Sequence, residues 1–192
     1  MNKDMQKEKK ENNKNKIILD LCGGTGAWSR PYKEAGYDVR IITLPSNDIR
    51  TYRPPKNVYG ILAAPPCTHF AVSGARWFKS KGKNALLEGL AVADACIRII
   101  QVTKPKFWAL ENPVGRLVNY YGKPKMYFNP CDYGDPYTKK TALWGVFNEP
   151  EKNPIKPELH SRIWYASPGP KRAELRSITP KGFADAFFKA NK

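Results

Sequence analysis

The sequence predicts one α/β domain built as three layers around a largely parallel sheet. Short apolar runs of the kind that form buried strands alternate with segments of helical periodicity. This alternation is typical of parallel sheets whose two faces are covered by helices. The chain has 192 residues, of which 41% are hydrophobic, and this is enough to bury the core of one such domain.

The first half of the chain supplies three strands and a helix. The run Ile17–Leu21 predicts a buried strand, because it is apolar and ends near a pair of glycines. A helical pattern follows over about 28–35 and is ended by a glycine. The apolar runs 39–44 and 59–63 predict the second and third strands, and two prolines follow the third.

The second half contains the longest predicted helix. Residues 84–102 carry apolar side chains at helical spacing over five turns. Strands are expected over 106–110 and 141–147, and an amphipathic helix over 181–190. In α/β folds of this kind, ligands bind at the carboxyl ends of the strands. We therefore expect chemically active residues where these strands end.

The chain is strongly basic. It has 33 Lys and Arg against 17 Asp and Glu, which gives a net charge of +16. Such an excess favours a polyanionic partner, most simply nucleic acid. Residues 1–16 have no apolar face, so we expect them to be a disordered basic tail before a folded domain over 17–192.

Other classes of protein are disfavoured. No apolar run approaches the roughly 20 residues that a membrane-spanning helix needs, and the first residues lack the apolar segment of a secretory signal. The four cysteines are widely spaced and only two histidines are present, so we expect no metal site. These features predict a reduced, cytoplasmic protein.

Three motifs follow predicted strands. The segment Asp20–Gly26 is a glycine-rich turn, which lets the backbone approach a nucleotide-like ligand. Cys67 follows two prolines that stiffen the turn, so it is a candidate nucleophile rather than a small buried apolar residue. Glu111 ends an apolar strand, where a carboxyl group is costly to bury without a role. Capping or a salt bridge is the alternative interpretation of Glu111.

In order and spacing, these motifs resemble the C5-cytosine-specific DNA methyltransferase family. Asp20–Trp28 is similar to the family segment that binds S-adenosylmethionine, and Pro65–Cys67 to its proline-cysteine motif. Residues 111–113 resemble its glutamate-asparagine-valine motif, and 132–136 and 176–180 resemble two later motifs. The resemblance covers the catalytic core of a minimal, phage-like enzyme. It implies the three-layer, Rossmann-like fold of S-adenosylmethionine-dependent methyltransferases.

The resemblance also implies S-adenosylmethionine as the cofactor and DNA, duplex or single-stranded, as the substrate. It assigns cofactor binding to Asp20, Leu21, Cys22, Gly24, Gly26, Trp28, Asp48 and Pro65. It assigns catalysis to Pro66, Cys67, Glu111 and Lys139. In this scheme the Cys67 thiolate adds to C6 of cytosine, which makes C5 nucleophilic enough to take a methyl group. Glu111 stabilises the protonated ring at N3.

The segment after Cys67 mixes cations with aromatic residues. That mixture suits phosphate contacts and stacking on an unpaired base. We expect nucleic-acid contacts from Arg76, Trp77, Lys79, Lys81 and Lys83, and from Lys140 farther along the chain. A solvated loop with a few packed aromatic side chains is the alternative interpretation.

The chain departs from the family pattern at two sets of binding residues. Leu44 stands where the family carries an acid for the ribose of the cofactor. The family's arginine-rich strand keeps only Lys139 at its first arginine position and has Thr141 at its second. Either Lys139 or Lys140 compensates for the missing arginine, or catalysis is weakened.

The chain is also short for that family. Only 30 residues lie between Gly145 and Arg176, which leaves no room for a separate target-recognition domain. We therefore expect weak readout of base sequence unless a partner protein supplies it, in the cytoplasm of a bacterial or phage-infected cell. Two alternatives stay open: a related methyltransferase acting on RNA or free cytosine nucleotides, and an inert module that binds nucleic acid or cofactor.

Overall fold

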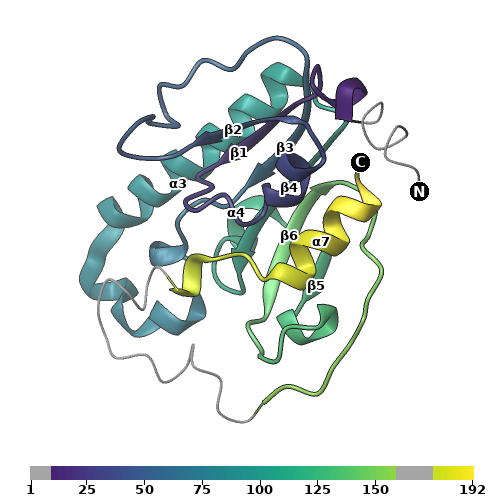
Figure 1. Ribbon diagram of the computed structural model, residues 1–192. Coiled ribbons are helices and arrows are strands. Elements are labelled where there is room, and N and C mark those ends of the chain that lie inside the picture. Colours follow the sequence, from purple (N-terminus) through teal and green to yellow (C-terminus); the bar gives the residue numbers. More distant parts are fainter. Residues whose placement is uncertain (1–9, 159–174) are drawn as a thin grey trace.

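Six strands form one sheet in the order β2-β1-β3-β4-β6-β5 (Figure 1). The computed structural model describes residues 10–158 and 175–192. The strands are β1 (Ile17–Leu21), β2 (Asp38–Ile42), β3 (Val58–Ala63), β4 (Phe107–Pro113), β5 (Met126–Phe128) and β6 (Thr141–Val146). The first four strands of the chain pair in parallel, whereas β6 runs antiparallel to both β4 and β5. The predicted α/β class with a largely parallel sheet is confirmed.

Helices cover both faces of the sheet and complete the three layers (Figure 1). Helix α3 (Phe78–Thr103) packs on one face, and α2 (Arg30–Glu34) and α7 (Lys181–Ala190) pack on the other. Successive side chains of β1 alternate between the layers, so that Leu19 packs in the core on the α3 side and Ile18 in the core on the α7 side. This two-sided burial explains why β1 and β3 read as continuous apolar runs.

The core on the α7 side is rich in aromatic rings. Phe183 is fully buried and stacks on Phe128 of β5, with the ring centroids 3.9 Å apart. Phe187 packs edge-on against Trp28, with the centroids 5.4 Å apart. These contacts fasten the C-terminal helix to the edge strand β5 and to the segment that precedes α2.

Some elements differ from the sequence prediction. Helix α3 begins at Phe78 rather than at residue 84, and Gly82, with φ 72°, interrupts its first turns. The sequence does not predict this extension because 79–83 contain no apolar side chain. The strand β5 and the short helix α4 (Val118–Tyr121) are not predicted either, since three or four residues are too few to show a period.

The end of the expected basic tail is packed against the domain. Residues 10–13 form a helical turn, in which Asn13 is buried and its Nδ2 donates to the Ala35 carbonyl at 3.0 Å. The Lys16 carbonyl accepts from the Asp38 N–H at 3.2 Å, which extends the pairing of β1 with β2. Residues 10–16 are therefore part of the folded domain, which corrects the expected boundary at Ile17. Residues 1–9 lie outside the described residues.

We predict that Phe183→Ala lowers the free energy of unfolding by about 3 to 5 kcal/mol, because truncating a buried phenylalanine removes apolar burial and leaves a cavity. Urea denaturation followed by circular dichroism measures this loss. Val102→Ala is the control: Val102 is 66% exposed on α3, and we expect a change within about 0.5 kcal/mol. Equal effects of the two substitutions would contradict the placement of Phe183 in the core.

Candidate active site

The carboxyl ends of β1, β3 and β4 lie side by side. The parallel registers pair Leu21 with Ala63 and Ala63 with Leu110. The glycine-rich turn, the Pro-Pro-Cys turn and Glu111 follow these three strand residues along the chain. Residues of all three segments line one cavity of about 590 Å³, which we call the main cavity. The structure therefore brings the predicted motifs together at the predicted edge of the sheet.

The glycine-rich turn has a backbone that most residues cannot adopt. Gly24 and Gly26 have φ values of 52° and 71°, in the left-handed region that favours glycine. A Cβ atom at Gly26 would lie 2.5 Å from Cδ1 of Ile41, whereas one at Gly24 would meet no atom within 4 Å. The turn therefore needs glycine for its shape at both positions, and at Gly24 it leaves open space beside the main cavity.

Asp20 and Trp28 line the main cavity, and each carries a buried polar atom without a partner in the part of the chain that the structure describes. Asp20 is fully buried, and its Oδ2 accepts from the Ser29 hydroxyl at 2.5 Å. Among the described residues, neither Asp20 Oδ1 nor Trp28 Nε1 has a hydrogen-bond partner. Burial raises the pKa of Asp20 to about 6, and the Ser29 hydrogen bond opposes this rise. A ligand that brings a cationic or donor group to this wall would relieve the cost of the buried carboxylate.

The candidate nucleophile Cys67 begins the 3₁₀ turn η1 (Cys67–His69), directly after the two prolines. Burial raises the pKa of the Cys67 thiol, and the negative charge of Glu111 raises it further. The charges of Lys139 and Arg176 act in the opposite direction. The thiol is therefore held protonated at neutral pH in the free protein, and its reactivity depends on the charges that surround it.

Glu111 and Lys139 form an ion pair across the main cavity wall. The Lys139 Nζ lies 3.7 Å from Glu111 Oε1, and both side chains are mostly buried. The Lys139 Nζ also donates to the Arg176 carbonyl at 2.9 Å. Of the two lysines proposed to replace the missing arginine, Lys139 lines the cavity. Lys140 is exposed and lies over the ring of Tyr127 instead.

Asn112 links the two catalytic segments, a role that the sequence analysis does not assign to it. Its buried Nδ2 donates to the Pro65 carbonyl at 2.9 Å, so β4 holds the turn that carries Cys67. Asn112 directly follows Glu111 at the end of an apolar run, and a polar residue in such a place needs a hydrogen-bond partner, which is the signal that could have identified it. The sequence does not show which partner it has.

The segment after Cys67 is fastened to the loop that follows β4. The Arg116 Nε donates to the His69 carbonyl at 2.7 Å, and its guanidinium lies 3.8 Å from the centroid of the Phe78 ring. Ala71 and Gly115 form an antiparallel bridge. A Cβ atom at Gly115 would lie 1.9 Å from the Phe70 carbonyl oxygen, so this crossing requires glycine. The backbone around Cys67 is thereby held from both ends.

A second cavity of about 370 Å³ adjoins the main one, and Cys22 and Pro66 line both. Asp48 lies in this second cavity, where both of its oxygens accept hydrogen bonds from Arg50. These hydrogen bonds lower the pKa of Asp48 to about 2. The second cavity is lined by both the turn after β1 and the loop after β2, which carry the predicted cofactor residues Cys22 and Asp48.

The remaining predicted residues are divided between the cavity, the core and the surface. The predicted site residues that line the main cavity are Asp20, Cys22, Gly24, Trp28, Pro65, Pro66, Cys67, Lys81, Glu111 and Lys139. Leu21 is fully buried in the core and lines neither cavity, as its place inside β1 requires. Gly26 shapes the turn without lining either cavity.

The predicted nucleic-acid residues of the segment 76–83 are exposed, and Ser73, Gly74 and Lys81 of the same stretch of chain line the main cavity. Lys81 donates to the Thr68 carbonyl at 3.1 Å. Arg76, Lys79 and Lys83 are exposed, and Arg76 lies over the ring of Trp77, which is 53% exposed. Arg176, Ser177 and Thr179 also line the main cavity. These three residues belong to the segment 176–180, which resembles a motif of the family, but they are not among the predicted site residues.

Within residues 10–158 and 175–192, no three His, Cys, Asp or Glu side chains gather into a group that could hold a metal ion. In the same residues, no helix is long and apolar enough to cross a membrane.

Comparison with known proteins relates the chain to methyltransferases. No protein-family model matches it. It is 25% identical over 171 residues to the Type II methyltransferase M.DdeI of Desulfomicrobium norvegicum, a match that covers 66% of this chain and 39% of that protein. Among solved structures it is similar to a prophage-encoded E. coli protein assigned as a DNA modification methyltransferase, with a TM-score of 0.49 and 17% identity. That match covers 80% of this chain and 55% of the other.

We predict that Asp20→Asn changes how stability depends on pH. Because the folded protein raises the pKa of Asp20 to about 6, ionisation opposes folding, and wild-type stability falls as the pH rises from about 4 through 6. The asparagine cannot ionise and keeps an acceptor for Ser29. Between pH 4 and pH 7 its free energy of unfolding should rise by about 2 kcal/mol relative to wild type. Urea denaturation of both proteins across this range measures the difference, and parallel pH curves would contradict the assignment.

Proposed function

We propose that the chain is an S-adenosylmethionine-dependent methyltransferase that transfers a methyl group to C5 of cytosine in DNA through a covalent adduct with Cys67. The observation that carries this proposal is that one cavity is lined by the glycine-rich turn, Cys67 and Glu111. The similarity to the Type II methyltransferase M.DdeI supports it, over a part of that protein's length.

The residues of the site fit the proposed cofactor. S-adenosylmethionine supplies an electrophilic methyl group on a sulfonium centre. The open backbone at Gly24 would hold its amino-acid end in the main cavity, with the buried carboxylate of Asp20 behind the glycine-rich turn. Cys22, shared by both cavities, lies where the ligand would pass into the second cavity, beside Asp48. A ligand with a cationic amino group would also stabilise the ionised form of Asp20.

Cys67 acts as the nucleophile in this proposal. Its thiol loses a proton to solvent, and the thiolate adds to C6 of a cytosine bound in the main cavity. The addition converts the ring to an enamine, whose C5 would take the methyl group as the bond between the methyl carbon and the cofactor sulfur breaks, leaving S-adenosylhomocysteine. Loss of the C5 proton to solvent and elimination of the thiolate restore the aromatic ring and free Cys67. The prolines before Cys67 and the Asn112 hydrogen bond to Pro65 restrict the backbone that carries the sulfur during these steps.

Glu111 and Lys139 stabilise the charge that develops on the ring. Glu111 takes up a proton from solvent when the base binds, donates it to N3 as Cys67 attacks C6, and takes it back when the thiolate is eliminated. Lys139, 3.7 Å from Glu111, stabilises the carboxylate form between these steps. The same cation opposes the rise in the pKa of Cys67 and so favours the thiolate.

Positive charge would supply much of the affinity for nucleic acid. The net charge of +16 and the exposed cations of the segment 76–83 support a phosphate-binding surface beside the main cavity. Trp77, half exposed beside Arg76, is suited to stack on an unpaired base. A duplex substrate must have its target base flipped out of the stack before it can reach Cys67. A partner protein that reads base sequence, and a cytoplasmic location, stay predictions of the sequence.

Methyl transfer from labelled S-adenosylmethionine tests the proposal directly. We expect the wild type to label C5 of cytosine in DNA, and Cys67→Ser to lose at least about 1,000-fold in rate, because the serine hydroxyl is a poor nucleophile without its own base. Cys131→Ser should retain activity, since Cys131 is buried in the 3₁₀ turn η3 (Pro130–Tyr133) and lines neither cavity. Equal C5 labelling by wild type and Cys67→Ser would overturn the assignment of the nucleophile.

The same assay distinguishes the alternatives. Duplex DNA, single-stranded DNA, RNA and dCMP are offered in parallel, and DNA that contains 5-fluorocytosine is offered with unlabelled cofactor. Because fluorine at C5 cannot leave as a proton, the adduct with Cys67 should accumulate as a complex that survives denaturing electrophoresis. Labelling of RNA or dCMP alone would reassign the substrate. Cofactor binding without transfer to any substrate would favour an inert module.

We predict that DNA binding depends steeply on salt and that the cations of the segment 76–83 carry part of this dependence. Replacing Arg76, Lys79 and Lys83 by glutamine should make the plot of the logarithm of the association constant against log[salt] less steep, by up to about 3 in slope. Each phosphate contact contributes about 0.9 to that slope. Replacing Lys56, Lys104 and Lys106 makes the same change of charge at the opposite end of the sheet, beside the amino ends of β3 and β4. Equal slopes for the two triple variants would contradict the assignment.

A further inference from the structure

The second cavity raises the question of which residue binds the ribose of the proposed cofactor. It opens beside Cys22 and Pro66, so a ligand held by the glycine-rich turn can extend into it. A ribose presents two neighbouring hydroxyl groups, and a carboxylate with free oxygens is well suited to accept hydrogen bonds from both. This question rests on the function proposed above, because it takes the adenosine end of the cofactor as the occupant.

The loop after β2 offers no free carboxylate for that purpose. Leu44, which stands where the resemblance would place an acid, is 67% exposed and lines the second cavity with an apolar side chain. Asp48 lies in the same loop, but its carboxylate already accepts hydrogen bonds from Arg50. Its Oδ1 accepts from the backbone N–H and Nε of Arg50, each at 2.9 Å, and its Oδ2 accepts from Nε and Nη2 at 3.0 and 2.5 Å. Four donor contacts use the acceptor capacity of one carboxylate.

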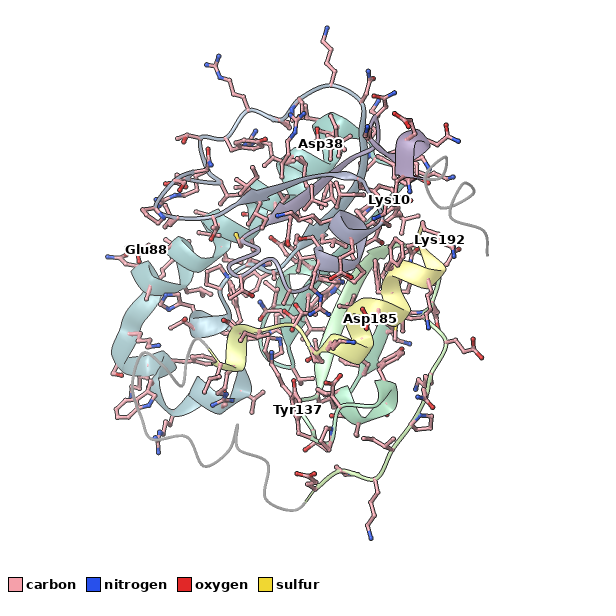
Figure 2. The ribbon with its side chains drawn as sticks, viewed as in Figure 1. Lys10, Asp38, Glu88, Tyr137, Asp185 and Lys192 are labelled. Carbon is pink, nitrogen blue, oxygen red and sulfur yellow. The ribbon has the colours of Figure 1, made fainter. Side chains whose placement is uncertain are left out.

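A carboxylate of α3 lines the second cavity together with the loop after β2. Glu88 belongs to α3, in its N-terminal half (Figure 2), and lines the second cavity together with its neighbour Gly89. Its side chain is exposed and has no hydrogen bond or ion pair within 4.0 Å to any of the residues that the structure describes. Gly89 packs against the ring of His69, which keeps this stretch of α3 close to the turn that carries Cys67.

The electrostatics agree with a position facing the loop after β2. Burial and the charge of Lys81 lower the pKa of His69, and the charge of Glu88 opposes this fall. Asp48 is the main cause of the raised pKa of Arg50, and Glu88 adds a smaller effect in the same direction. Glu88 therefore lies near both residues, which line the same cavity. Asp48 and Glu88 are the two carboxylates that line the second cavity among the described residues, and of these Asp48 is bound by Arg50.

We propose that Glu88 binds the ribose hydroxyl groups of the cofactor, in the role that an acid after the second strand would otherwise fill. The two oxygens of its carboxylate accept hydrogen bonds from the 2′ and 3′ hydroxyls. Helix α3 thus contributes to the cofactor site as well as to the core, and the acid has moved from the loop after β2 to the helix that faces it.

Binding of S-adenosylhomocysteine to the full chain, measured by isothermal titration calorimetry, tests this assignment. Glu88→Ala should weaken binding about tenfold or more, the usual size of a lost hydrogen bond to a charged group. Alanine is favourable in an exposed helical position, so the fold should persist. The decisive comparison uses the 2′,3′-dideoxyadenosyl analogue of S-adenosylhomocysteine. Wild type should bind this analogue more weakly than S-adenosylhomocysteine, whereas Glu88→Ala should bind both ligands about equally.

Glu151→Ala is the matched control, because it removes the same charge from an exposed residue that lines neither cavity. We expect it to bind S-adenosylhomocysteine as wild type does. If Glu88→Ala discriminates between the two ligands as strongly as wild type, Glu88 does not bind the ribose and the inference is overturned while the proposed function stands. If wild type binds neither ligand, the proposed function fails and the inference fails with it.

Discussion

Parallel pairing of β1, β3 and β4 between helical layers determines where the three predicted motifs lie. The strands are mostly buried, so most of their side chains form core, and the residues at and after their carboxyl ends are the ones that line the cavity. Because the strands point in the same direction and their registers align Leu21, Ala63 and Leu110, those following segments meet at one edge. Segments far apart in the chain thereby become the walls of one cavity.

Hydrogen bonds from β4 and the loop after it then restrict how the Pro-Cys turn can move. Asn112 holds the Pro65 carbonyl, and Arg116 holds the His69 carbonyl, so the backbone is bonded on either side of Cys67. The close crossing at Gly115 brings this loop against Phe70. Catalysis by a nucleophile depends on its distance from the reacting atom, and such cross-links reduce the freedom of the sulfur before any substrate binds.

The charges of the main cavity are balanced incompletely. Asp20 is buried beside a single hydroxyl donor and has a raised pKa, whereas Glu111 has Lys139 beside it. Cys67 lies between the opposing influences of Glu111 and of the cations Lys139 and Arg176. A binding site with uncompensated buried groups loses stability when empty and recovers it when a complementary ligand arrives. A cationic cofactor next to Asp20 would do this for the proposed enzyme.

Sequence alone was sufficient for the layered α/β class and for the common location of Cys67, Glu111 and the glycine-rich turn, because chain order and strand periodicity imply a common edge. It was insufficient wherever a side chain binds distant backbone, as with Asn112 and Arg116. It also could not choose between Lys139 and Lys140, since neighbouring residues of an extended segment point to opposite sides and only the pairing of β6 with β4 decides which one faces Glu111. The expected tail was misjudged in part because Asn13 is buried by contacts with Ala35, 22 residues away.

The amino-acid sequence therefore determined the local pieces: which runs become strands, where turns need glycine or proline, and which reactive side chains follow them. Those properties depend on a few neighbouring residues and so can be read along the chain. Tertiary structure alone decided that Leu21 is core rather than cofactor wall, that Asp48 is already bound by Arg50, and that Glu88 of α3 faces the second cavity. These outcomes depend on distances between segments far apart in the chain, which packing sets and no local pattern records.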